Sequence, residues 1–299
     1  MLRGLTRHLY PLAVLGGLAV FLSCRAAGGP AALAVTVWCA LLLGLCALLE
    51  RAQPFEPHWL RADADTAADW QSAAVLLAAI EPLLQATLPL LATTLGDLMP
   101  PAAAGTLAHG PLGMQVLAAV LWMEFAKYLS HRLHHRWAPL WALHALHHSP
   151  QRLYWLNQLR VHPLNHAINS LLSLLPLLML GIPADALVGA LALTQPILML
   201  QHANVRTDNG WINSILSTNE AHRWHHSSDP AEAHANYGSA LLIWDHVFGT
   251  FRPVIAGGAP RAVGLFDSGH GHPAKASYLR QLAAPFRALV PPCCRPNAA

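Results

Sequence analysis

The chain has 299 residues, of which only 11% are charged and 54% are hydrophobic, and its mean hydropathy is +0.36. Soluble domains seldom combine such values, so the composition all but excludes a water-soluble enzyme and excludes a disordered chain. The 18 Lys and Arg against 15 Asp and Glu give a net charge of +3, and the basic residues are scattered. Because they form no basic patch, nucleic acid is not an expected partner.

Apolar stretches that approach the length of a membrane-spanning helix cover residues 8–24, 31–49, 71–95 and 112–130. A fifth run, 167–203, is about twice too long for one span and is interrupted by Gly181, Pro183 and Asp185, so we expect a helical hairpin there. We interpret the first run as an uncleaved membrane helix, since Arg25 and a second apolar run follow it at once. These patterns predict an all-α, multi-pass membrane bundle of four long helices plus a helical hairpin.

The basic residues predict the orientation of this bundle. With the N-terminus in the cytoplasm, Arg25 is the only basic residue on the outer side, as the positive-inside rule favours. We therefore expect a bacterial cytoplasmic-membrane protein in which a histidine-rich cap lies on the cytoplasmic face. The expected divisions are N-terminal membrane helices over 1–110, a catalytic region over 111–255 and a cytoplasmic tail over 256–299.

Histidine is the outlier of the composition, with 19 residues, 12 of which lie between His131 and His226. Three histidine boxes stand out: His131 and His135 in SHRLHHR, His144, His147 and His148 in HALHHS, and His222, His225 and His226 in HRWHHS. On a helix, positions i, i+3 and i+4 share one face, so each box directs its imidazoles to one region. This spacing is typical of a chelating ligand set.

Eight box imidazoles exceed the four ligands of a tetrahedral zinc, which implies two metal ions. No cysteine pattern suits a metal and carboxylates are scarce, so the donors favour iron, zinc or another borderline divalent ion. The chain also lacks HExxH, the motif that supplies a zinc protease with its general base. A hydrolytic function therefore loses its usual catalytic residue.

At these residues the chain resembles the fatty acid hydroxylase and sterol desaturase superfamily of integral membrane di-iron oxygenases, which share one HxxxH and two HxxHH boxes. The resemblance runs from about Glu124 to Thr250 and includes the HRLHHRWAPLWALHALHHS stretch, LRVHP, QHANV, EAHRWHHS, NYG and WDHVFGT. It implies that the metal ligands are His131, His135, His144, His147, His148, His222, His225 and His226, with His202 and His162 completing the set.

The resemblance implies an oxidoreductase that hydroxylates or desaturates a fatty acyl, sterol or similar lipid, with two iron ions, O2 and external electrons. The chain has no HPGG, flavin fingerprint or GxGxxG motif, so a separate donor is expected, a reductase with a ferredoxin or cytochrome b5-like protein. An ether-lipid monooxygenase or a carotenoid hydroxylase is the alternative within the superfamily. From another class, a histidine-lined metal transporter would place its ligands inside the spans, whereas these boxes lie at helix ends.

Other histidines need separate treatment. We expect His134 to be no ligand, because a further imidazole would crowd the metal pair. His166 could replace His162 or support it, and Asn165 stands where relatives often have Glu. His234 and His246 are expected to have supporting or structural roles, and exposed positions are expected for His8, His58, His109, His270 and His272.

Acids and tryptophans near the boxes also have expected roles. Asp245 and Glu220 are candidates to accept the second N–H of a ligand histidine, although a cap or loop role is equally open. Glu81 and Glu124 are expected to face the bundle interior or to line a substrate passage. A belt at the membrane interface explains most of the tryptophans near the boxes, which are Trp137, Trp141, Trp155, Trp211, Trp224 and Trp244.

Overall fold

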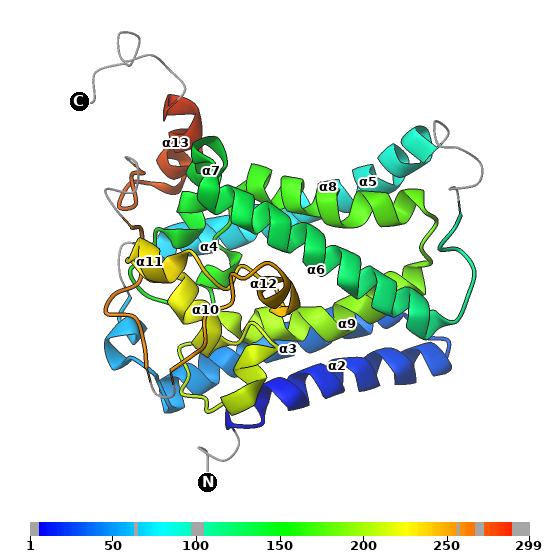
Figure 1. Ribbon diagram of the computed structural model, residues 1–299, viewed down its shortest axis with the longest axis horizontal. Coiled ribbons are helices and arrows are strands. Elements are labelled where there is room, and N and C mark those ends of the chain that lie inside the picture. The colour runs from blue at the N-terminus through cyan, green and yellow to red at the C-terminus, as the bar shows by residue number, and fades with distance from the viewer. Residues whose placement is uncertain (1–5, 63–64, 97–104, 256–257, 267–271, 289–299) are drawn as a thin grey trace.

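The computed structural model describes residues 6–62, 65–96, 105–255, 258–266 and 272–288. Long helices lie roughly antiparallel and form the bundle (Figure 1). They are α2 (Leu9–Ala26), α3 (Ala31–Ala52), α4 (Thr66–Val75) continued by the π-helical segment η2 (Leu76–Ile80) into α5 (Glu81–Gly96), α6 (Leu112–Arg136), α8 (Pro163–Met179) and α9 (Ala184–Gln201). Five helical segments are long and apolar enough to cross a membrane. Within the described residues, strand pairing is limited to isolated bridges, so the predicted all-α membrane fold is confirmed.

The fifth apolar run forms the predicted hairpin of α8 and α9. The intervening turn depends on Gly181, whose φ of +75° suits glycine, and a Cβ there would lie 3.0 Å from the Gly105 Cα. Pro183 then caps the start of α9. At this same end of the bundle, Asp185 accepts from the Arg25 guanidinium of α2 at 2.7 Å. The chain therefore reverses direction between α8 and α9, and the C-terminal ends of α6 and α9 lie at the same end of the bundle.

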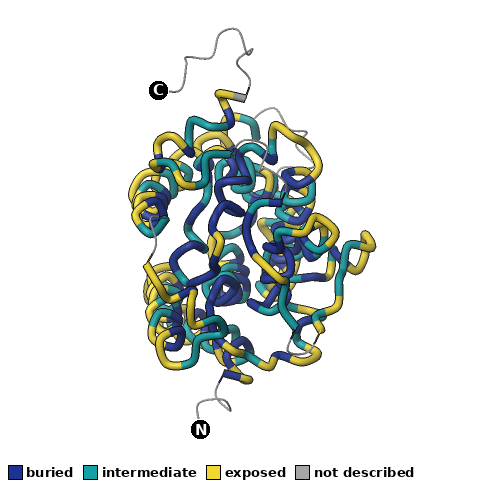
Figure 2. The backbone as a smooth tube through the Cα atoms, turned by 90° about the vertical axis from the view of Figure 1, so that its left-hand side faces the viewer, coloured by how far each residue is buried: buried dark blue, intermediate teal, exposed yellow. Residues whose placement is uncertain are grey.

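The bundle buries its core between α2, α3, α6, α8 and α9 and leaves apolar side chains on its periphery. Leu9, Leu42 and Ile197 belong to one buried cluster that joins the first two helices to α9. Leu15 and Leu90 are instead exposed, as lipid-facing side chains are. Figure 2 shows buried segments in the middle of the molecule and exposed stretches outside. Because α2 and α3 share a core with α9, the buried core continues across the predicted boundary at residue 110. The domain limits stay a prediction.

Short helices cover the end of the bundle at which α6 and α9 finish (Figure 1). They are η1 (Pro57–Leu60), α7 (Ala138–His148), η3 (Asn157–Leu159), η4 (Gly210–Ser214), α10 (Asn219–His225), α11 (Pro230–Ala233), α12 (Ile243–Val247) and α13 (Tyr278–Ala288). The last of these packs against α7 and α4. This arrangement matches the predicted histidine-rich cap, whereas its cytoplasmic location stays a prediction.

Candidate metal centre

Histidines from four segments converge beneath the short helices in two groups. The first group is His131, His135, His144, His148 and His225; the second group is His147, His202, His222 and His226. In each group the nitrogen atoms that could bind a metal all lie within 4.8 Å of one another. The structure thus brings together nine of the ten sequence-predicted ligands.

The two HxxHH boxes divide between the groups in a reciprocal way. On α7 the i and i+4 residues, His144 and His148, belong to the first group, and the i+3 residue His147 belongs to the second. On α10 the assignment is reversed, since His225 at i+3 joins the first group while the other two box residues join the second. Each short helix therefore contributes to both groups, which holds the two groups side by side.

Several ring nitrogens in these groups lack a hydrogen-bond partner although they are buried. Among the described residues, no group pairs with Nε2 of His131, His144 or His225. In the second group, Nε2 of His222 lies 3.1 Å from Nε2 of His202 and 3.0 Å from Nε2 of His226. Leaving such atoms unpaired costs free energy, and converging imidazole nitrogens are what a borderline divalent ion binds. The residues therefore fit a pair of metal ions.

The opposite ring nitrogen is fixed in five of these histidines by an oxygen acceptor. Nδ1 donates from His131 to Tyr237 O at 2.8 Å, from His225 to Ala235 O at 2.9 Å, from His147 to Arg160 O at 3.2 Å, from His144 to Asn165 Oδ1 at 2.8 Å and from His202 to Asn157 Oδ1 at 2.8 Å. A carbonyl oxygen can only accept, so Nδ1 holds the proton and the Nε2 lone pair stays available for a metal.

The sequence pattern predicted none of these five acceptors and pointed to Asp245 and Glu220. Asp245 instead accepts from the backbone N–H groups of Tyr237 and Gly238, at 2.8 and 2.7 Å, and so holds the segment whose carbonyl receives His131. Glu220 accepts from Asn213 Nδ2 at 2.6 Å and from Thr207 Oγ1. Neither carboxylate hydrogen-bonds a histidine of the two groups, because main-chain carbonyls and asparagines occupy those positions.

The comparisons with known proteins agree with this geometry. A family model described as fatty acid hydroxylase matches residues 116–250, which hold both histidine groups. An ornithine lipid hydroxylase from Rhizobium tropici is 34% identical over 257 residues, which cover 82% of this chain and 73% of the relative. The chain belongs to the fatty acid hydroxylase family. It is a membrane lipid hydroxylase and thus an oxidoreductase, as predicted.

Other relatives match a shorter part of this hydroxylase. An alkylglycerol monooxygenase from Danio rerio is 30% identical over 152 residues, which cover 50% of this chain and 34% of the relative. The Homo sapiens alkylglycerol monooxygenase is 32% identical over 134 residues, 45% of this chain and 30% of the relative. The chain thus spans about a third of these two proteins. No solved structure matches it. Lipid-oxidising relatives do not favour the metal-transporter alternative.

His162 is the one implied ligand that the structure places outside both groups. Its Nδ1 accepts from Leu164 N at 3.1 Å, and its Nε2 donates to Leu282 O at 3.2 Å. His162 thus caps the start of α8 and ties that helix to α13, so the ligand role expected for it is not carried further. His166 does not replace it, because its Nε2 lies 2.8 Å from Glu81 Oε1.

The other described histidines of the hydroxylase lie outside both groups. His134 is buried outside both groups, and its Nδ1 donates to Ser130 O at 2.7 Å. His246 Nε2 lies 2.8 Å from Ser214 O. His8, His58 and His109 are exposed, as expected. His272 is not exposed, because both of its ring nitrogens are buried. His270 lies outside the described residues.

Burial sets the protonation of the grouped histidines outside the membrane-spanning helices. It lowers the pKa of His147 to about 4, and it lowers the pKa values of His144, His148, His202, His222, His225 and His226 well below the ordinary value. Neutral imidazole is the form that binds a metal ion. The hydroxylase therefore keeps these side chains competent for a metal at neutral pH.

Proposed function

We propose that this hydroxylase inserts one oxygen atom from O2 into a membrane lipid with the aid of two iron ions, one held by each histidine group. The carrying observation is the reciprocal division of the boxes, with buried Nε2 atoms converging in both groups. Zinc has no redox chemistry, whereas oxidation of an unactivated C–H bond requires a redox-active metal. Iron fits both the nitrogen donors and this requirement.

When bound, the iron pair supplies the activation of O2 that no side chain provides. The chain itself keeps the imidazoles neutral, fixes their Nδ1 protons on carbonyl and amide oxygens, and holds the groups at the ends of α6 and α9. Glu124, buried on α6, accepts from the backbone N–H groups of Ala240 and Leu241, at 2.7 and 2.8 Å, and so secures the segment that follows Tyr237. Because the site adjoins membrane-spanning helices, a membrane-dissolved lipid reaches it without leaving the bilayer.

The substrate proposed first is an ornithine lipid, since the relative with that substrate in its name matches most of the chain. The overall reaction joins one oxygen atom to the lipid carbon and reduces the other to water, which consumes two electrons and two protons. A separate reductase with a ferredoxin or cytochrome b5-like protein supplies the electrons. We place the histidine groups on the cytoplasmic face of a bacterial membrane, where such a donor is available.

Lipid analysis of cells with and without the gene tests the reaction. The proposal predicts that an ornithine lipid carrying one extra oxygen is lost with the gene and returns with the wild-type chain. It also predicts that the His225→Ala chain does not restore it. Identical lipid profiles in both strains, or full restoration by His225→Ala, would overturn the proposal.

Cysteine labelling tests the orientation. Asp185 at the hairpin turn and Asp208 after α9 are both exposed, and they lie at opposite ends of α9. An impermeant thiol reagent added to intact cells should label Asp185→Cys and leave Asp208→Cys unlabelled. Labelling of Asp208→Cys from outside would place the histidine groups on the outer face and exclude a cytoplasmic donor.

A further inference from the structure

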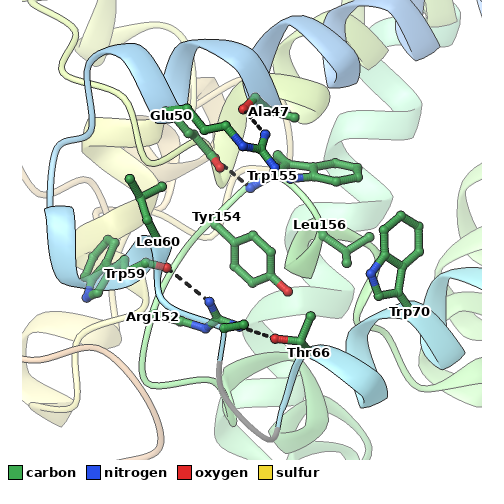
Figure 3. Close-up of a pocket in the computed structure, with 12 residues that line it drawn as sticks. Ala47, Glu50, Trp59, Leu60, Thr66, Trp70, Arg152, Tyr154, Trp155 and Leu156 are labelled. Atoms are coloured by element: carbon green, nitrogen blue, oxygen red, sulfur yellow. Dashed lines mark hydrogen bonds between the residues drawn. The ribbon is translucent and has the colours of Figure 1, made fainter.

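A cavity of about 220 Å³ lies between the end of α3, the start of α4 and the chain that precedes η3 (Figure 3). Four aromatic side chains line it, Trp59, Trp70, Tyr154 and Trp155, together with the charged groups of Glu50, Arg51 and Arg152. The rings of Trp70 and Trp155 meet edge to face with centroids 5.8 Å apart. Tryptophan faces in a concave site are suited to a cation.

Glu50 supplies an anionic group in this cavity. Its side chain is buried, and Oε1 accepts from Trp155 N at 2.7 Å and from Asn204 N at 2.9 Å. In the described part of the chain, no hydrogen-bond donor is paired with the other carboxylate oxygen. That oxygen is available to a donor inside the cavity, and a charge-assisted hydrogen bond there is strong.

The guanidinium of Arg152 does not compete for this role, because the protein already uses it. It donates to Arg61 O at 2.7 Å, to Asp65 Oδ1 at 2.8 Å and to Thr66 Oγ1 at 2.7 Å. It also lies over the Tyr154 ring at 4.3 Å from the centroid. Arg152 is therefore a structural part of the wall. Arg51 also lines the cavity, where its Nη1 donates to Ala47 O, and Glu50 is the carboxylate among the lining residues.

The exposed rim of the cavity includes apolar side chains and the side chain of Arg51. Leu60 and Trp70 line the cavity and are both exposed large hydrophobic residues. Since α3 ends and α4 begins here, the rim lies at the same end of the spans as the histidine groups. A polar site at the ends of membrane-spanning helices matches the depth of a lipid head group.

The cavity wall is also connected to the second histidine group. Tyr154, Trp155 and Leu156 line the cavity, and the next residue, Asn157, accepts from His202 Nδ1. On the other side, the Glu50 carboxylate receives the N–H of Asn204, two residues beyond His202. Two segments that hold His202 thus also hold Glu50.

We propose that this cavity binds the head group of the lipid substrate, that this head group carries a protonated amine, and that Glu50 is its counter-ion. The proposal rests on the proposed function and deepens it by assigning head-group recognition to named residues. Glu50 and the tryptophans are specificity residues that contact the substrate away from the reacting carbon. A lipid anchored here is held by segments that also hold His202.

Equilibrium binding to the purified, iron-loaded chain in phosphatidylcholine nanodiscs tests this assignment. The probes are an ornithine-headed lipid with a free amine and the same lipid with that amine acetylated. We expect the free-amine lipid to bind about tenfold more tightly, in keeping with a charge-assisted hydrogen bond and cation–π contacts. Glu50→Gln should weaken free-amine binding about tenfold and leave acetylated-lipid binding unchanged, since the amide can still accept from both backbone N–H groups.

Matched variants keep the result interpretable. Glu56→Gln changes a carboxylate that pairs with His58 outside the cavity, so it should bind both lipids as the wild type does. If Glu50→Gln does not fold, Trp70→Leu at the exposed rim serves as the second variant. It should weaken binding of the free-amine lipid and leave binding of the acetylated lipid unchanged. Free ornithine should not displace the lipid; displacement at equal concentration would mean that the site binds a soluble amine.

The assignment is wrong if the wild type binds both lipids equally, or if Glu50→Gln and Trp70→Leu both keep the preference. Binding is measured without turnover, which separates this proposal from the proposed reaction. A chain that selects the amine lipid but forms no oxidised product would contradict the reaction alone. A chain that oxidises lipids without selecting the amine would contradict the cavity assignment alone.

Discussion

The two ends of the helical bundle differ in the segments and the polar side chains that form them. At one end the turns before α3 and α9 are short, and an exposed ion pair joins Arg25 to Asp185. At the other end, short helices enclose two histidine groups and a buried ion pair between Arg160 and Asp69. Spanning a membrane requires apolar length, whereas assembling a metal site requires polar groups that find partners away from water. Substitutions at the two ends should therefore differ greatly in effect.

The largest effects are expected at the i+3 histidines of the boxes. His147→Ala removes a nitrogen donor from the second group, and His225→Ala removes one from the first. Each should lower lipid hydroxylation by more than about 100-fold, since loss of even a supporting residue around a metal costs about 10- to 100-fold. Product formation per chain measures this, with exposed His8→Ala as the control. Normal turnover by either box variant would contradict the ligand assignment.

Next in size is the buried ion pair that supports the site. The Arg160 guanidinium donates to Asp69 Oδ1 at 2.8 Å and to Gln281 Oε1 at 2.7 Å, and both charged side chains are fully buried. Arg160→Leu leaves the Asp69 charge uncompensated, which should lower the free energy of unfolding by about 3–5 kcal/mol. Thermal unfolding in detergent measures the loss. The double variant with Asp69→Leu should regain part of it, and an unchanged melting temperature for Arg160→Leu alone would refute this role.

A smaller effect is expected where an asparagine orients a grouped histidine. Asn165→Leu removes the acceptor of the His144 Nδ1 proton and should weaken metal affinity about 10- to 100-fold, as loss of such supporting groups does. Competition with a chelator measures that affinity. Asn165→Glu restores an oxygen acceptor and should recover most of it. Equal affinities for the Leu variant and the wild type would show that the hydrogen bond does not orient His144.

The smallest effect is expected at the opposite end. Arg25→Gln breaks an ion pair whose side chains are about half exposed, so the free energy of unfolding should change by no more than about 1 kcal/mol. Hydroxylation should be unchanged because the pair lies at the far end of the spans. Unfolding and activity measured on the same preparation check both points. A loss of activity here would mean that the two ends are coupled.

The same contrast explains what could be predicted from the sequence. Apolar length placed the spans, and Gly181 with Pro183 marked the hairpin turn, because spanning helices depend on composition more than on particular contacts. The box spacing, together with the family resemblance, identified nine grouped histidines. It did not reveal that His162 is a helix cap. Pro163 starts α8, which leaves His162 at the N-terminus of that helix.

The partners of the site escaped prediction for a physical reason. The carbonyl oxygens of Tyr237, Ala235 and Arg160 belong to the backbone, so no side-chain type marks them. The belt interpretation stays a prediction for Trp137 and Trp211, which are exposed, and does not apply to two buried tryptophans. Trp141 is buried and stacks on Phe266 with centroids 4.4 Å apart, and Trp224 is also buried. Such packing against the cap depends on tertiary contacts that periodicity does not encode.

Metal content per chain tests the central claim most directly. The wild-type hydroxylase, expressed with iron supplied and purified in detergent, should contain two iron atoms per chain, because the structure offers two separate sets of converging imidazole nitrogens. Elemental analysis combined with a protein determination gives this ratio. Two iron atoms per chain are the predicted result; one tightly bound zinc ion, or no metal under iron-replete conditions, would contradict the account.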